Sequence, residues 1–126
     1  MTKIALLTSA TGGGAGIAAQ RVFNALKRVE DNDDQIDLLD MNSLGGPIPT
    51  DVASHSGGSN KIFSDTHYTV EFPGYVRSEL IDRLCQYDAL NIHWCSYMLT
   101  LSEIKAIACA GKKIVFTCHD FYYFLG

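Results

Sequence analysis

The stretch Lys3-Ile-Ala-Leu-Leu-Thr-Ser-Ala-Thr-Gly-Gly-Gly-Ala-Gly-Ile17 begins as an apolar run and continues into a cluster of glycines. Residues 3–9 predict a strand, residues 10–16 a glycine-rich turn, and residues 17–29 an amphipathic helix. A strand that leads through glycines into a helix suits a phosphate, because glycine allows close backbone approach and the first N–H groups of a helix are unpaired. We therefore expect this turn to contact a nucleotide or a nucleotide sugar.

The rest of the chain alternates between strand and helix patterns. Residues 35–41 and 89–94 predict strands, while residues 74–87 and 101–110 predict helices. The run at 113–119 predicts a last strand, and its continuous apolar start is typical of a central strand buried on both faces. This order predicts an α/β fold with a Rossmann-like, mostly parallel sheet and flanking helices.

Composition changes between the second strand and the second helix. All three prolines and five of the eleven glycines lie within residues 42–74. We expect residues 42–64 to form a long flexible surface loop, because residues 54–60 are too polar and flexible to pack in a core. Loops of this length in compact domains are usually functional or disordered.

Length and charge exclude several classes of protein. The 126 residues predict about one domain. The net charge is −4 and the basic residues are dispersed, so we expect no nucleic-acid partner. No apolar run approaches the ~18 residues of a membrane span, and the first apolar run is too short for a secretory signal. The four cysteines lack CxxC spacing, so we expect free, buried thiols, a cytoplasmic location and no metal site.

Two further segments carry candidate chemistry at strand ends. His119 and Asp120 follow the last strand, and Trp94 ends the strand before it. Ligands of open parallel sheets bind beyond the carboxyl ends of the strands, where the glycine turn also lies. We therefore expect these residues and the glycines to face one cleft, although neighbours on an extended chain, such as His119 and Asp120, point in opposite directions.

The glycine turn also fits a second functional hypothesis. Gly14-x-Gly16-x-x-Ala19 matches the dinucleotide fingerprint, and Asp37 or Asp40 follows at about the distance of the ribose ligand. Under this alternative the chain is a nicotinamide-dinucleotide-binding domain of an oxidoreductase. A third alternative is a non-catalytic α/β interaction domain.

Three ordered motifs resemble a known family. They are Gly13-Gly-Ala-Gly16-Ile-Ala-Ala, the segment from Phe72-Pro-Gly74 to Asp88-Ala-Leu-Asn-Ile-His-Trp94, and the run with Thr117, His119 and Asp120. Together they resemble the N-terminal domain of retaining glycosyltransferases with the GT-B fold, of the family 4-like type that acts in bacterial exopolysaccharide and O-antigen synthesis. The residues from 45 to 60 have no counterpart in this resemblance.

The resemblance implies specific roles. The enzyme would move a sugar from a nucleotide-sugar donor to a saccharide or lipid-linked acceptor, without a metal or other cofactor, in the cytoplasm or at the inner face of the membrane through peripheral association. The site residues would be His119 as the catalytic contact to the donor sugar, Gly13, Gly14, Gly16 and Asp120 for donor binding, and Trp94 and Tyr122 on the acceptor side.

The sequence also departs from the family pattern. Cys95 stands where members often have Asn, and Tyr122-Tyr-Phe-Leu-Gly126 stands where they often have Trp-Pro-Phe-Thr-Gly. The second, donor-side domain of the family has no counterpart within the 126 residues. We therefore expect residues 1–126 to be an acceptor-side fragment that does not catalyse transfer alone, and turnover by the purified chain would refute this.

Overall fold

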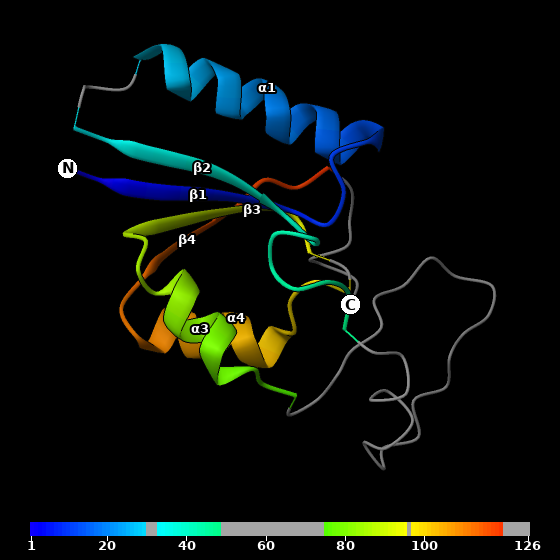
Figure 1. Ribbon diagram of the computed structural model, residues 1–126, viewed down its shortest axis with the longest axis vertical. Coiled ribbons are helices and arrows are strands. Elements are labelled where there is room, and N and C mark those ends of the chain that lie inside the picture. Colours follow the sequence, from blue (N-terminus) through cyan, green and yellow to red (C-terminus); the bar gives the residue numbers. More distant parts are fainter. Residues whose placement is uncertain (30–32, 49–74, 96, 120–126) are drawn as a thin grey trace.

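The computed structural model describes residues 1–29, 33–48, 75–95 and 97–119. Figure 1 shows a parallel sheet between two helical layers. The elements in chain order are β1 (Lys3–Thr8), α1 (Gly13–Val29), β2 (Gln35–Asp40), α3 (Ser78–Leu84), β3 (Ala89–Trp94), α4 (Leu101–Cys109) and β4 (Lys113–Phe116). The described sheet has four strands in the order β2-β1-β3-β4, and every pair is parallel. The predicted Rossmann-like α/β fold is confirmed.

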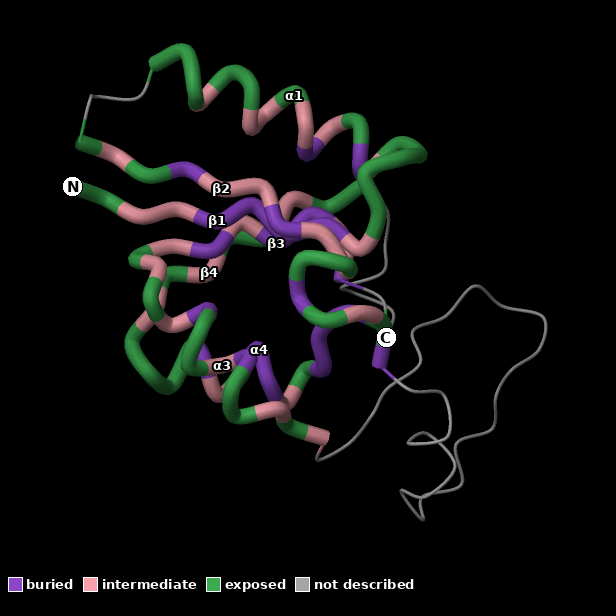
Figure 2. The backbone as a smooth tube through the Cα atoms, viewed as in Figure 1, coloured by how far each residue is buried: buried purple, intermediate pink, exposed green. Residues whose placement is uncertain are grey.

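Helices cover both faces of the sheet. α1 packs across β1, β2 and β3, while α3 and α4 lie together on the opposite face (Figure 1). Figure 2 shows that burial concentrates along the central strands and on the inner sides of α3 and α4. The main core between the sheet and these two helices includes Ala5, Leu7, Leu80, Leu84, Leu90, Ile92, Ile104 and Ile107. β1 has four consecutive buried residues because it is covered on both faces.

The first helix begins earlier than the sequence pattern predicts. α1 starts at Gly13, so Gly13, Gly14 and Gly16 lie in its first turns and not in a separate loop. Glycine is a poor residue for a helix interior, and the pattern therefore favoured a later start. The backbone of Gly13 has a φ of 72°, which explains why the chain needs glycine where it enters the helix.

The last strand is not the central strand that its apolar run predicted. β4 is shorter than predicted and lies at the edge of the described sheet, where it pairs with β3. Val115 is 54% exposed and Phe116 is 40% exposed. An apolar run indicates that its side chains favour burial, but it does not indicate which strands or helices lie next to it in the fold.

Other boundaries also differ from the expectations. The helix predicted at 74–87 is the shorter α3, Ser78–Leu84. Of the predicted loop at 42–64, only residues 42–48 are described, and there Leu44 and Ile48 are buried. The four cysteines are free thiols, as predicted, but the prediction that they are buried is wrong for three of them, since Cys95 is buried, Cys85 is half-buried, and Cys109 and Cys118 are exposed. Within the described parts of the chain, no helix is long and apolar enough to cross a membrane.

A buried ion pair joins α4 to the segment before α3. The Glu103 side chain is 0% exposed, and its Oε1 accepts from Arg77 Nε at 2.8 Å. A second guanidinium nitrogen of Arg77 donates to Glu103 Oε2 at 2.9 Å and to the Met98 carbonyl at 2.6 Å. The Arg77 backbone N–H also donates to Glu103 Oε1 at 2.9 Å. The carboxylate is thereby paired and well hydrogen-bonded, as burial requires.

The same glutamate completes a capping box at the start of α4. Thr100 Oγ1 accepts from the Glu103 N–H at 3.0 Å, and Glu103 Oε2 accepts from the Thr100 N–H at 3.0 Å. Thr100 Oγ1 also donates to the Tyr75 carbonyl at 2.8 Å. Although burial by itself would raise the pKa of Glu103, hydrogen bonds from Arg77 and Thr100 and the Arg77 charge hold it below its usual value.

Candidate functional site

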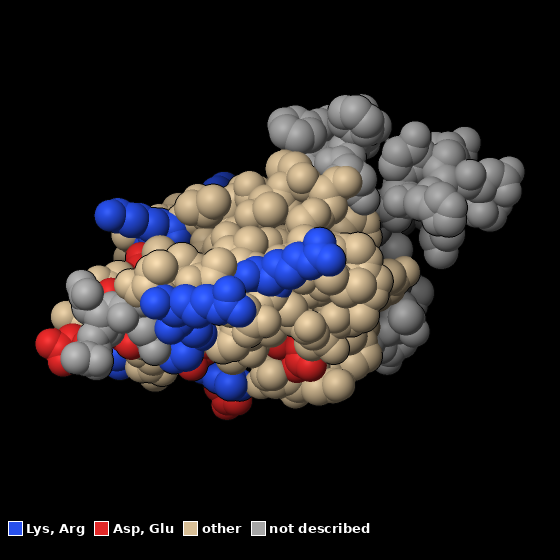
Figure 3. Space-filling model, turned by 90° about the horizontal axis from the view of Figure 1, so that it is seen from above, with Lys and Arg blue, Asp and Glu red and all other residues tan. Residues whose placement is uncertain are grey.

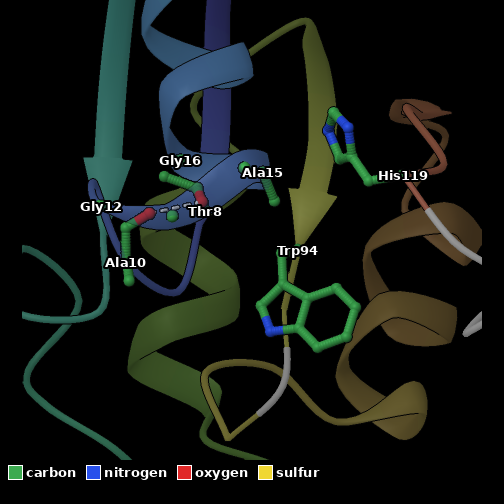
Figure 4. Close-up of a pocket in the computed structure, with 9 residues that line it drawn as sticks. Thr8, Ala10, Gly12, Ala15, Gly16, Trp94 and His119 are labelled. Carbon is green, nitrogen blue, oxygen red and sulfur yellow. Dashed lines mark hydrogen bonds between the residues drawn. The ribbon is translucent and has the colours of Figure 1, made fainter.

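A pocket of about 310 Å³ opens at the carboxyl ends of β1 and β3. The glycine turn forms one side, and Trp94 and His119 lie across from it (Figure 4). Its lining residues are Thr8, Ala10, Gly12, Gly13, Gly14, Ala15, Gly16, Trp94 and His119. The structure thus brings together five predicted site residues, namely Gly13, Gly14, Gly16, Trp94 and His119. Its volume is near the lower end of the range for small-molecule sites.

Gly16 is the point of closest contact between the turn and the helix. A Cβ added there would overlap the Ala10 carbonyl oxygen and lie 2.5 Å from the Thr11 carbonyl carbon. No atom lies within 4 Å of a Cβ added at Gly14. Gly16 is therefore required by packing, while Gly14 leaves open space on the pocket side of the turn.

Side chains at both ends hold the turn in shape. Thr8 Oγ1 donates to the Ala10 carbonyl at 2.8 Å, and Gln20 Nε2 donates to the Thr11 carbonyl at 3.2 Å. The Ser9 N–H donates to the Trp94 carbonyl at 2.8 Å. The turn after β1 is thus fixed directly to the end of β3.

A β-bulge in β3 changes the direction of the side chains at the end of the strand. Leu7 pairs with Ile92 but Thr8 pairs with Trp94, so His93 is an extra residue on β3. A bulge of this kind bends a strand and redirects its side chains, and bulges are frequent beside active sites. Here it accompanies the placement of Trp94 in the pocket wall.

His119, in the pocket wall, forms a pair with His93 of β3. Nδ1 of His93 lies 3.0 Å from Nε2 of His119, and the rings are stacked with centroids 5.2 Å apart. His93 is fully buried, whereas His119 is exposed. Burial lowers the pKa of His93, and the neighbouring His119 lowers it further. The buried ring is therefore neutral at neutral pH.

This burial predicts a pH-dependent stability. The pKa of folded His93 lies below the unfolded value of about 6.5, so its contribution to stability is complete above about pH 6.5 and declines as the pH falls below it. We expect urea unfolding to give a smaller free energy at about pH 5.5 than at about pH 7.5. His93→Leu should reduce the difference between the two values, and an equal difference in both proteins would contradict this assignment.

The acidic residues of the dinucleotide alternative have other partners. Asp37 Oδ2 accepts from the Tyr87 hydroxyl at 2.7 Å, and burial together with this carboxylate raises the pKa of Tyr87 to about 12. Asp40 Oδ1 accepts from the Ser43 hydroxyl at 2.7 Å and from the Ser43 N–H at 2.8 Å, which lowers the pKa of Asp40. Both carboxylates therefore have hydrogen-bond partners within the fold, and neither is among the residues that line the pocket.

The basic residues that the structure describes lie outside the pocket lining. Figure 3 shows Lys and Arg side chains spread over the face seen from above, with acidic side chains among them. Lys27 and Arg28 lie in the last turn of α1, at the end opposite its glycines. Among the described residues, those that line the pocket include no Lys or Arg. An anion there would meet the start of a helix and an imidazole ring.

Two predicted site residues, Asp120 and Tyr122, lie outside the described residues. In the ranges that the structure describes, no group of three His, Cys, Asp or Glu side chains could hold a metal ion. The sequence did not predict the contact between His93 and His119, because the bulge at His93 and a partner 26 residues away leave no local signal.

Comparisons with protein-family models, with curated proteins and with solved structures found no match to this chain.

Proposed function

We propose that the pocket binds the diphosphate of a nucleotide sugar and that the chain is the acceptor-side, N-terminal part of a glycosyltransferase. The observation that carries this proposal is the meeting of the glycine turn, His119 and Trp94 in one pocket. These residues come from the three motifs that resemble the glycosyltransferase family.

The pocket chemistry suits a leaving diphosphate. When the bond between sugar and diphosphate breaks, negative charge develops on the leaving oxygens. The first N–H groups of α1 have no partner within the helix and carry partial positive charge, so they stabilise an anion at this end. Because these dipoles are already oriented by the fold, they need no rearrangement as the charge develops.

His119 and Trp94 complete the proposed site. His119 supplies an imidazole nitrogen that can donate a hydrogen bond to a ligand oxygen. The indole of Trp94 supplies an apolar face for a sugar ring and one N–H donor. Both lie opposite the glycines (Figure 4), so a ligand of the proposed class would lie between them.

Replacement of His119 tests the proposal. We expect His119→Ala to weaken binding of UDP-glucose or GDP-mannose to the chain by roughly tenfold or more, because it removes one ligand hydrogen bond and widens the pocket. Isothermal titration calorimetry of both proteins measures the change. The circular dichroism spectrum should not change, because His119 is exposed.

A matched replacement away from the pocket provides the control. Cys109 is exposed in the last turn of α4, and Cys109→Ala should leave nucleotide-sugar binding unchanged. Equal affinities for the parent chain and His119→Ala would contradict the proposed role of His119. Binding of NAD with no binding of nucleotide sugars would favour the dinucleotide alternative.

A further inference from the structure

Three contacts hold the segment that carries His119 against β3. The Thr117 N–H donates to the Ile92 carbonyl at 2.9 Å, and Thr117 Oγ1 donates to Asn91 Oδ1 at 2.8 Å. The third contact joins His119 Nε2 to His93 Nδ1. The first two contacts fix Thr117 and leave the His119 ring able to turn about its χ angles. The third contact is made by the ring itself and restricts this rotation.

We propose that His93 is a positioning residue, which holds Nε2 of His119 so that His119 meets a phosphate-bearing ligand through Nδ1. His93 can do this because it is 0% exposed and sits at the bulge of β3, so its own ring is held by the core. The two ring planes lie within 25° of parallel, so the facing nitrogens can share a hydrogen bond close to the plane of both rings. This inference rests on the proposed function of the pocket.

The contact also constrains the protons of the pair. A hydrogen bond between two ring nitrogens holds one proton, so Nδ1 of His93 and Nε2 of His119 cannot both carry one. If His93 donates, neutral His119 carries its proton on Nδ1. If His119 donates, it presents an N–H at Nδ1 only as the cation. An anionic ligand, which needs a donor, therefore selects one of these two states of the pair.

Two replacements of His93 separate positioning from packing. His93→Leu fills a similar space without hydrogen bonding, while His93→Asn places an amide near the position of Nδ1. Cys109→Ala is the control, because Cys109 is exposed in the last turn of α4 and lies outside the pocket lining. Circular dichroism shows which variants are folded.

Calorimetry with UDP as the probe measures the effect of each replacement. We expect His93→Leu to weaken UDP binding about tenfold, the equivalent of one ordinary hydrogen bond, with His93→Asn and Cys109→Ala within about threefold of the parent chain. A folded His93→Leu chain that binds UDP as tightly as the parent overturns the proposal. If His93→Leu does not fold, UDP binding to His93→Asn as weak as that to His119→Ala overturns it.

Nitrogen-15 spectra of the histidine rings test the same idea without a variant. We expect a coupling between His93 Nδ1 and His119 Nε2 across the hydrogen bond, and we expect UDP to shift the His119 Nδ1 signal more than the Nε2 signal. A larger shift at Nε2 overturns the proposal while leaving the proposed function intact. Absence of binding of UDP, GDP and dTDP to the parent chain overturns the proposed function, and with it the ligand role of the pair.

Discussion

Gly16→Ala is expected to remove ligand binding at the pocket and to destabilise the fold by about 3 kcal/mol. The added methyl would overlap the Ala10 carbonyl oxygen and the Thr11 carbonyl group, which are backbone atoms of the turn. Backbone atoms cannot rotate away as the end of a long side chain can, so the turn itself must move. A displacement of about 1 Å is enough to reduce the function of an oriented site by about 100-fold. Urea unfolding and calorimetry with UDP-glucose measure the two effects.

Gly14→Ala is the matched control for this change. Gly14 belongs to the same first part of α1, but a Cβ there meets no atom within 4 Å. We expect stability equal to the parent or slightly higher, because alanine favours a helix more than glycine does. If both variants lose the same amount of stability, the turn does not depend on the close approach at Gly16.

Glu103→Gln is expected to destabilise the folded chain by about 3 kcal/mol. The change removes the charge that pairs with Arg77 and replaces one of the two accepting oxygens by an NH2 group, and it leaves the guanidinium without its anion. We place the cost at the lower end of the range for broken buried ion pairs because the Arg77 side chain is 23% exposed. Urea unfolding at neutral pH measures the difference.

The contribution of the Arg77–Glu103 pair to stability is expected to fall at acidic pH. The pKa of folded Glu103 is lowered, so its contribution is present above the unfolded pKa of about 4.5 and is lost as the pH falls through the folded value. Glu79→Gln is the control, since Glu79 is exposed in the first turn of α3 and should change stability by less than about 0.5 kcal/mol. Equal effects of the two replacements would show that the buried pair does not stabilise the fold.

The sequence predicted the order of elements and the parallel sheet because both leave local signals. Periodicity of apolar residues located the strands and helices, and the glycines marked the turn after β1. Thr100-x-x-Glu103 also has the local pattern of a capping box, so the start of α4 was readable from the sequence. The pattern does not reveal that Arg77 reaches the same carboxylate, because that contact spans 26 residues.

The features that sequence reasoning missed depend on packing between distant segments. The apolar run of β4 resembles that of a central strand, yet β4 lies at the edge of the described sheet, and only the strand order shows this. Asp37 has suitable spacing for a ribose ligand, but Tyr87 occupies its carboxylate. His93 becomes significant through the bulge in β3 and through a partner that follows β4.

The most direct test of the proposed pocket is a backbone-amide NMR titration of the chain with UDP-glucose, GDP-mannose and NAD. If the pocket binds a nucleotide sugar as proposed, the ligand shifts the amide signals of Gly13, Gly14, Gly16 and His119 together, with one affinity, while those of α4 remain in place. Shifts caused by NAD alone, or no shift of the glycine signals with any nucleotide sugar, would contradict this proposal.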